Sequence, residues 1–229
     1  MKYQPVNSGL VKIPGKPADY NDDQLVSLQT LSDVMVTGYH AALNAEVRPG
    51  YTVAVIGYSA VDLAGVIGAK LLGAEKIILL SHHDDRAQLG REFGATDIVS
   101  SRDEEAVKDV LSLTKENAGA DAVLECVGAE SAIEQAGQIA RPGAVIGRVS
   151  VPHAEPKSNP LFWKNVGLRG GIASATKPDK EVLLQVVLDG KINPGKVFTK
   201  SFDLDHIQDA YEAMSNRDAI KSLIIVNDK

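Results

Sequence analysis

Residues 57–62 have the spacing of a phosphate-binding turn but lack two of its three glycines. The segment reads Gly-Tyr-Ser-Ala-Val-Asp and separates a short apolar run from a helical pattern. A turn that binds the pyrophosphate of a dinucleotide has glycine at the positions of Gly57, Ser59 and Asp62. Only Gly57, which allows the sharp turn, follows that pattern. The chain therefore has the framework of a dinucleotide site with altered phosphate contacts.

The two substituted positions change the chemistry of the turn. Ser59 adds a Cβ and a hydroxyl where a pyrophosphate would approach the backbone, although the hydroxyl can donate a hydrogen bond. Asp62 falls in the first turn of the predicted helix, where its carboxylate interacts favourably with the helix dipole. A pyrophosphate would use the same positive end, so the two anions would compete. The alternative is that Asp62 only stabilises an unliganded helix. Val61 is assigned to the cofactor-binding set with them.

The residues after the second apolar run favour NADP(H) over NAD(H). The run ends at Ser81, where an acidic residue would bind the ribose 2′-hydroxyl of NAD(H). His82, His83 and Arg86 follow instead. Such side chains can donate to the 2′-phosphate of NADP(H). The alternative is a solvated, charged helix start.

Composition and charge exclude several classes of protein. A net charge of −6 and a pI near 5.4 argue against a nucleic-acid binder. No apolar run approaches the roughly 18 residues of a membrane span, and the N-terminal residues lack the apolar core of a signal peptide. Cys126 is the single cysteine, which excludes an internal disulfide framework and a multi-cysteine zinc site. We expect Cys126 to be a buried strand residue and the protein to be cytoplasmic.

The elements that position these residues alternate between strand and helix. The predicted strands are short apolar runs, as in a parallel sheet covered on both faces, and they span 52–57, 76–81, 97–99, 122–126, 144–149 and 167–172. The predicted helices between them span 60–73, 84–93, 104–117 and 131–139. This alternation predicts an α/β fold, a Rossmann-type doubly wound parallel sheet with strand order 3-2-1-4-5-6.

The two ends of the chain depart from this alternation. We expect an extended apolar stretch at 10–13, a short helix at 22–28, and a helix at 30–47 with a break at Thr37 and Gly38. The C-terminal part is predicted to hold helices at 179–189 and 205–214 and strands at 197–202 and 222–226. We therefore expect small strands at both termini and three parts, at 1–30, 31–175 and 176–229.

Eight segments in consistent order resemble the zinc-dependent, medium-chain alcohol dehydrogenases. They are LSDVMVTGYHAA (31–42), VRPGYTVAVIG (47–57), AKLLGAEKIILLS (69–81), REFGATDIV (91–99), ADAVLECVG (120–128), ARPGAVIGRV (140–149), GKINPGKVF (190–198) and DAIKSLIIV (218–226). The resemblance covers about residues 31–226 and implies the nucleotide-binding and C-terminal parts of that family. It also implies further cofactor contacts. Thr37 would lie near the nicotinamide, and Val149 would lie at its carboxamide. Val127 and Gly128 would line the adenosine side, and Lys221 would approach the pyrophosphate.

The resemblance also bears on zinc. The family's first two catalytic zinc ligands belong to an N-terminal chaperonin-10-like domain that no segment here resembles, and the third falls at Asp33. Zinc needs three or four protein ligands. We therefore expect no zinc and assign no catalytic residue. The alternative for Asp33 is a helix N-cap or a surface carboxylate.

These observations predict a truncated, alcohol-dehydrogenase-like protein: a Rossmann domain with weakened NADP(H) binding and no dehydrogenase activity of its own. Two alternatives stay open. One is an active NADP(H)-dependent oxidoreductase, either as a fragment or with a partner chain that supplies the zinc domain. The other is a non-enzymatic, homo-oligomeric interaction module.

The family resemblance implies a homodimer through the edge strand at 167–172. The strands at 197–202 and 222–226 are expected to pair with 10–13 or with another copy, because open edges invite pairing.

Overall fold

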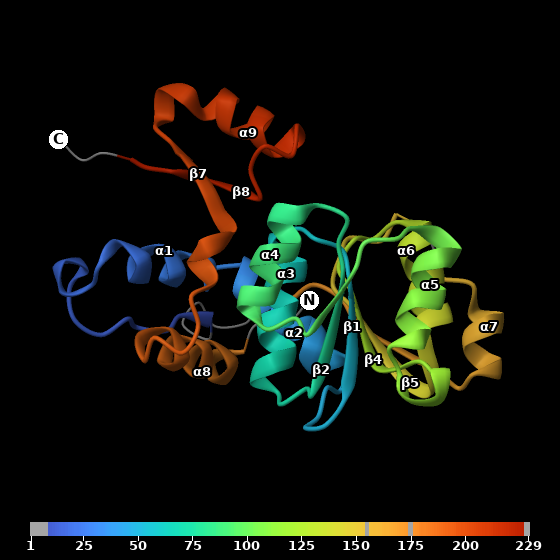
Figure 1. Cartoon of the computed structure of the whole chain (residues 1–229). Coiled ribbons are helices and arrows are strands. Elements are labelled where there is room, and N and C mark those ends of the chain that lie inside the picture. The colour runs from blue at the N-terminus through green and yellow to red at the C-terminus, as the bar shows by residue number, and fades with distance from the viewer. Residues whose placement is uncertain (1–8, 154–155, 174–175, 227–229) are drawn as a thin grey trace.

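The computed structural model describes residues 9–153, 156–173 and 176–226, and its centre is a six-stranded sheet (Figure 1). The strand order is β3-β2-β1-β4-β5-β6, and each neighbouring pair is parallel. This confirms the predicted Rossmann-type order 3-2-1-4-5-6. The strands are β1 (Thr52–Ile56), β2 (Lys76–Leu80), β3 (Asp97–Val99), β4 (Ala120–Glu125), β5 (Ala140–Arg148) and β6 (Gly167–Gly170).

Helices cover both faces of this sheet, so successive strand residues enter different cores. In β1, Val53 and Val55 pack into one core, and Ala54 and Ile56 pack into the other. The first core is covered by α2 (Val34–Asn44), α3 (Ala60–Leu71) and α4 (Asp84–Phe93). The second is covered by α5 (Asp103–Ser112) and α6 (Glu130–Ile139), with α7 (Ser158–Trp163) beside them (Figure 1). This two-sided burial explains why the strands read as unbroken apolar runs.

The N-terminal part contains helix α1 (Asp22–Thr30), as predicted, and an uninterrupted α2. The predicted break at Thr37 and Gly38 is wrong. A Cβ on Gly38 would collide with the backbone nitrogen of Gly65 in α3. Gly38 therefore serves the close crossing of two helices and does not end one.

A second, two-stranded sheet belongs entirely to the C-terminal part. Strand β7 (Phe198–Phe202) pairs in parallel with β8 (Lys221–Ile224), and α9 (Ile207–Ser215) connects them. Between β6 and β7 lies α8 (Lys177–Leu188). In Figure 1, β7, β8 and α9 form a lobe that projects from the main body. Short 3-10 helices complete the described chain: η2 (Pro17–Asp19), η3 (Lys115–Asn117), η4 (Pro194–Val197) and η5 (Leu204–His206).

The N-terminal end differs from the prediction. Residues 10–13 form no strand, so they do not pair with β7 or β8. Val11 instead packs against a small apolar cluster of Leu28, Leu184 and Val187, on α1 and α8. Val11 therefore contacts helices and not a strand, while Leu10 and Ile13 are exposed. Within the described residues, no helix is both long and apolar enough to cross a membrane.

Candidate nucleotide-binding site

A pocket of about 470 Å³ opens at the carboxyl edge of the large sheet, where the strand order reverses between β1 and β4. Ligands of doubly wound sheets bind at such a position. Its lining comes from the ends of β1, β2 and β4, the segment after β3 and helix α6. Four predicted site residues belong to the lining, namely Gly57, Ser81, His82 and Val127. The other predicted residues do not line the pocket.

The turn after β1 is filled by the side chain of Asp62. Gly57 adopts a φ of +116°, in the region that favours glycine, and a Cβ there would first meet Asp62 Oδ1. Asp62 Oδ2 accepts hydrogen bonds from the backbone N–H of Ser59, at 2.7 Å, and from its hydroxyl, at 2.5 Å. The carboxylate therefore lies inside the turn and occupies an N–H at the start of α3.

The environment of Asp62 disfavours its negative charge. The residue is 1% exposed, and Oδ1 is a buried atom without a hydrogen-bond partner among the described residues. Burial raises the pKa of Asp62 to about 6, the hydrogen bonds from Ser59 oppose that rise, and the charge of Glu125 adds to it. Nearby, burial and the carboxylates of Asp62 and Glu125 raise the pKa of the Cys126 thiol well above its ordinary value. Cys126 is therefore no activated nucleophile.

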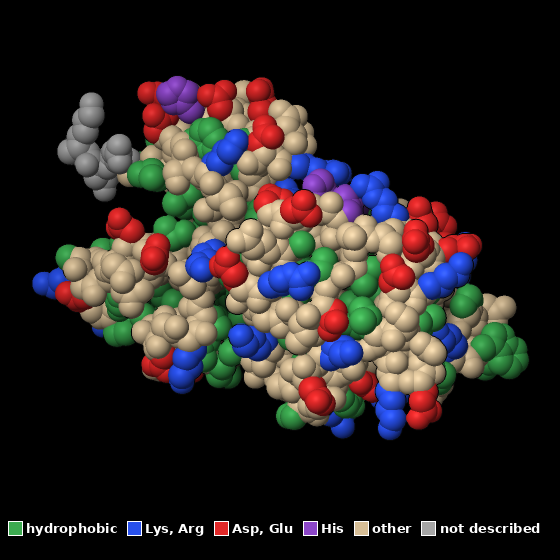
Figure 2. Space-filling view, viewed as in Figure 1, with side chains coloured by type: hydrophobic (Ala, Val, Ile, Leu, Met, Phe, Trp, Pro, Cys, Tyr) green, Lys and Arg blue, Asp and Glu red, His purple; other side chains and the backbone are tan. Residues whose placement is uncertain are grey.

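Cationic and aromatic side chains gather at the end of β2. The ring centroids of His82 and His83 each lie 4.7 Å from that of Tyr58 and 4.4 Å from each other. Burial lowers the pKa of His82, and the charges of neighbouring arginines lower it further. Figure 2 shows histidine side chains beside Lys and Arg side chains at the boundary between the main body and the C-terminal lobe. Ser81, 2% exposed, follows β2 directly and precedes His82.

Arg86 is buried and bridges two parts of the chain. Its guanidinium donates to the carbonyl oxygen of Tyr58 at 3.2 Å and to that of Ala219 at 3.3 Å. It also lies 5.4 Å from the centroid of the Tyr58 ring. Its Nε is buried without a hydrogen-bond partner among the described residues. The structure therefore uses Arg86 to join the turn after β1 to the C-terminal lobe, and a phosphate would have to share it.

Two arginines that the sequence analysis did not assign lie at the same cluster. Arg102 lines the pocket just after β3, and its charge lowers the pKa of His82. The Arg217 guanidinium carbon lies 5.9 Å from the centroid of the Tyr58 ring. Arg102 is detectable in principle, because it follows a predicted strand at the carboxyl edge. Arg217 carries no local signal, because only the packing of the lobe brings it here.

Glu125 is a further residue that the sequence analysis missed, and it organises the opposite side of the crevice. Its fully buried carboxylate accepts from the backbone N–H groups of Val127, at 2.8 Å, and Gly128, at 2.6 Å. The other oxygen accepts from Arg148 Nε at 3.0 Å and from the Ser150 hydroxyl at 3.1 Å. One carboxylate therefore fixes the loops that follow β4 and β5.

The remaining predicted positions lie in several elements. Val149 donates its N–H to the carbonyl oxygen of Glu125 at 3.2 Å, and both Val149 and the half-buried Val61 pack against the first core. Lys221 is the first residue of β8. The Thr37 hydroxyl donates to the backbone oxygen of Asp33 at 2.8 Å.

The described residues give zinc no ligand set. Asp33 holds the N-cap position of α2, but its side chain makes no capping hydrogen bond. No group of three or more His, Cys, Asp or Glu side chains in the described part of the chain is placed to hold a metal ion. The residues present therefore do not fit a catalytic zinc ion.

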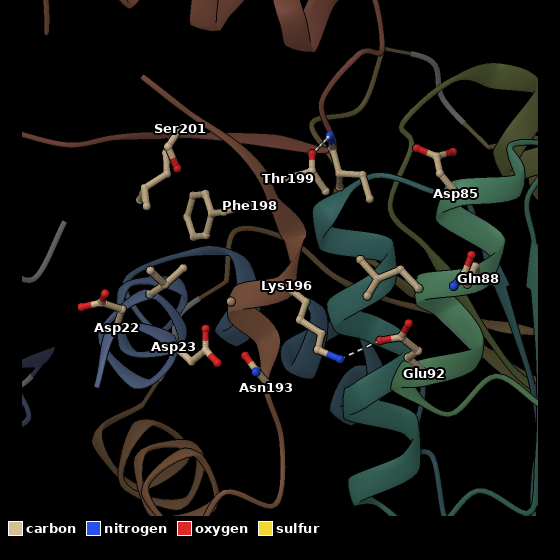
Figure 3. Close-up of a pocket in the computed structure, with 15 residues that line it drawn as sticks. Asp22, Asp23, Asp85, Gln88, Glu92, Asn193, Lys196, Phe198, Thr199 and Ser201 are labelled. Atoms are coloured by element: carbon tan, nitrogen blue, oxygen red, sulfur yellow. Dashed lines mark hydrogen bonds and ion pairs between the residues drawn. The ribbon is translucent and has the colours of Figure 1, made fainter. Parts of the chain in front are cut away.

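A second pocket, of about 580 Å³, lies between α1, α4 and the C-terminal strands (Figure 3). Carboxylates from α1 and α4 face it, and Lys196 binds Glu92 at 2.7 Å. None of the predicted site residues lines this pocket. Its acidic character makes it a poor site for a phosphate-bearing ligand.

Comparisons with known proteins identify the family of this chain. The family model described as zinc-binding dehydrogenase matches residues 60–187. The chain belongs to this family. An alcohol dehydrogenase of Cupriavidus necator is 29% identical over 215 residues, covering 91% of this chain and 57% of that protein. An NADP-dependent isopropanol dehydrogenase of Thermoanaerobacter brockii is 32% identical over 206 residues, covering 86% and 58%. These findings confirm the resemblance drawn from the eight segments.

Solved structures of this zinc-binding dehydrogenase family have the same architecture. The alcohol dehydrogenase TADH from Thermus sp. ATN1 superposes with a TM-score of 0.80 at 27% identity, over 88% of this chain and 59% of that one. A zinc-dependent alcohol dehydrogenase 2 from Streptococcus pneumonia superposes with a TM-score of 0.80 at 29% identity, over 93% of this chain and 62% of that one. The chain therefore spans about three fifths of the length of these relatives.

Proposed function

We propose that this chain is an alcohol-dehydrogenase-like nucleotide-binding domain whose affinity for NADP(H) is weakened by its own Asp62. The observation that carries the proposal is the position of the Asp62 carboxylate inside the turn after β1, hydrogen-bonded to the N–H of Ser59. A pyrophosphate uses N–H groups at such a helix start. To bind there, it must displace the carboxylate or lie beside a like charge.

The preference for NADP(H) over NAD(H) rests on the residues at the end of β2. The position where a carboxylate would accept from a ribose 2′-hydroxyl is held by Ser81. His82 and Arg102 line the pocket at that point. The Arg102 cation and a ring N–H of His82 can both donate to a 2′-phosphate there. Several relatives are described as NADP-dependent isopropanol dehydrogenases, which supports the same preference.

We further propose that the chain alone does not oxidise alcohols. Removing a hydride from an alcohol needs a Lewis acid or a proton-transfer group at the reacting oxygen. Asp33 is exposed and has no cluster of ligating side chains around it in the described residues.

Isothermal titration calorimetry with NADPH and NADH tests the cofactor proposal. The unmodified chain is expected to bind NADPH weakly, with a dissociation constant above about 100 μM, and NADH more weakly still. Low-micromolar NADPH binding would contradict the weakening, and equal binding of the two would contradict the preference. Turnover in an alcohol oxidation assay with NADP⁺ and added zinc would contradict the proposal that the chain alone does not oxidise alcohols.

We also propose a homodimer through β6. This strand ends the sheet, pairs with β5 alone among the described strands, and is mostly exposed. Nearby Ile172 is 94% exposed. Joining two copies edge to edge would cover these groups in an isologous contact. Light scattering after gel filtration should give twice the chain mass, and Ile172→Glu should weaken the dimer. A clean monomer across the micromolar range would contradict it.

A further inference from the structure

The turn between α9 and β8 contacts Arg86 and Tyr58, beside the nucleotide pocket. Ala219, in this turn, accepts a hydrogen bond from buried Arg86, which joins the lobe to the start of α4. Two residues earlier, Arg217 adopts a φ of +65°, and its guanidinium carbon lies 5.9 Å from the centroid of the Tyr58 ring. Tyr58 lines the pocket. A residue more than 150 positions away in the sequence therefore presents its charge at the pocket rim.

The arginines around Tyr58 are not neutralised by ion pairs within the described residues. Arg102 and Arg217 form no ion pair with a carboxylate of the described residues. Two buried nitrogen atoms at the same cluster, Arg86 Nε and His83 Nε2, have no hydrogen-bond partner in that part of the chain. Buried polar groups normally have partners. Unmatched donors and charges beside an open pocket are typical of a site for an anionic ligand.

The two phosphate positions of an adenine nucleotide would meet opposite charges here. A phosphate on the ribose 2′-oxygen lies beyond the end of β2 in this fold, which is where the cations gather. A phosphate on the 5′-oxygen lies at the turn after β1, which Asp62 fills. Asp103 and Glu104, which also line the pocket, can accept from the adenine amino group or a ribose hydroxyl.

We propose that Arg217 is a specificity-determining residue for adenosine 2′-phosphates, and that the C-terminal lobe thereby supplies a phosphate-binding cation to the nucleotide domain, in addition to Arg102. The inference rests on the proposed function and deepens it. The ligand class is an adenosine carrying a 2′-phosphate, either as the free nucleotide or within NADP(H). The 5′-phosphate contributes little, because Asp62 opposes it.

Adenosine 2′-monophosphate and adenosine 5′-monophosphate give a matched pair of probes, because they share composition and charge and differ only in the position of the phosphate. In calorimetric titrations of the full chain, the unmodified protein is expected to bind the 2′-isomer at least about tenfold more tightly. Arg217→Gln should weaken the 2′-isomer by about tenfold and leave the 5′-isomer within about twofold. Arg217→Lys should keep part of the preference, because it keeps the charge.

Arg48→Gln is the matched control. Arg48 is an exposed arginine that precedes β1, so it lies at the opposite edge of the sheet, and it pairs with Glu46. Its loss removes the same charge and should change neither affinity. Thermal melts of all variants check that the lobe remains folded.

The outcomes separate this inference from the proposed function. If the 2′-isomer binds the unmodified chain and Arg217→Gln leaves that binding unchanged, or weakens both isomers equally, the inference is overturned and the nucleotide-binding proposal stands. If neither the 2′-isomer nor NADPH binds the unmodified chain, the proposed function fails and the inference fails with it. Selective loss of the 2′-isomer supports both.

Discussion

The turn after β1 and the end of β2 lie at the same edge of one sheet, yet the charged side chains they place there have opposite signs. At the turn, Asp62 places a carboxylate inside the backbone curve and takes the N–H of Ser59. At the end of β2, arginines and histidines surround Tyr58 beside an open pocket. The comparison teaches that a fold can be kept while its ligand contacts change one region at a time.

The largest effect on stability is expected at Glu125, which fixes the loops that follow β4 and β5. Glu125→Ala removes the buried carboxylate that holds Arg148, Ser150 and two backbone N–H groups. We expect it to lower the free energy of unfolding by about 3–5 kcal/mol, as measured by chemical denaturation. The control is Glu46→Gln, which weakens the surface ion pairs with Arg48 and Arg169 and should cost less than about 1 kcal/mol. Equally small losses of unfolding free energy in the two variants would show that Glu125 does not stabilise these loops.

A smaller effect is expected where the two regions meet the C-terminal lobe. Arg86→Gln removes the donors to the carbonyl oxygens of Tyr58 and Ala219. Loss of a charged donor to two backbone acceptors should cost about 1–3 kcal/mol of unfolding free energy. Hydrogen exchange should rise first in β8 and in the turn before it. Unchanged protection there would mean that Arg86 does not fasten the lobe.

The pH dependence of stability sharpens the comparison at the turn. The folded-state pKa of Asp62, about 6, lies above the ordinary 3.8. The native state therefore holds this proton more tightly than the unfolded chain, so stability rises as the pH falls through 6 towards 4. Relative to Asp62→Asn, which cannot titrate, the unmodified chain should gain about 1 kcal/mol between pH 7 and pH 5. Parallel pH profiles of the unfolding free energy in the two proteins would contradict a raised pKa for Asp62 in the folded state.

The smallest effect is expected at Lys221, which the family resemblance places near the pyrophosphate. If Asp62 keeps a pyrophosphate out of the turn, as we propose, Lys221→Gln should change the NADPH affinity of the unmodified chain by less than about twofold. With glycine at positions 59 and 62, the same substitution should cost several-fold more. A loss of equal size in both backgrounds would show that Lys221 and the turn act independently.

Much of the fold was predictable from the sequence, because its causes are local. The apolar runs between helical patterns predict the six strands and their order, and the segment motifs predict the family. Gly38 misled the prediction because a glycine that ends a helix and one that permits a close crossing look alike in sequence. The stretch at 10–13 looked like a strand because apolar residues fit either a sheet edge or, as Val11 does, a helical cluster.

The site was only partly predictable. The position of the Asp62 carboxylate at the start of α3 follows from its place in the first helical turn. The bond from Ser59 could also have been read from the three-residue spacing of a capping box. The bridge from Arg86 to Ala219 and the ion pair of Glu125 with Arg148 join residues 133 and 23 positions apart. Packing alone sets such contacts, so sequence patterns do not reveal them.

The most direct test of the account is one pair of calorimetric titrations on the unmodified chain and on the Ser59→Gly, Asp62→Gly double variant. With both glycines restored, the NADPH affinity should rise at least tenfold, about 1.4 kcal/mol, while the affinity for adenosine 2′-monophosphate should stay within about twofold. That result would locate the defect at the turn alone. An unchanged NADPH affinity in the double variant would contradict the central claim that Asp62 occupies the place of the pyrophosphate.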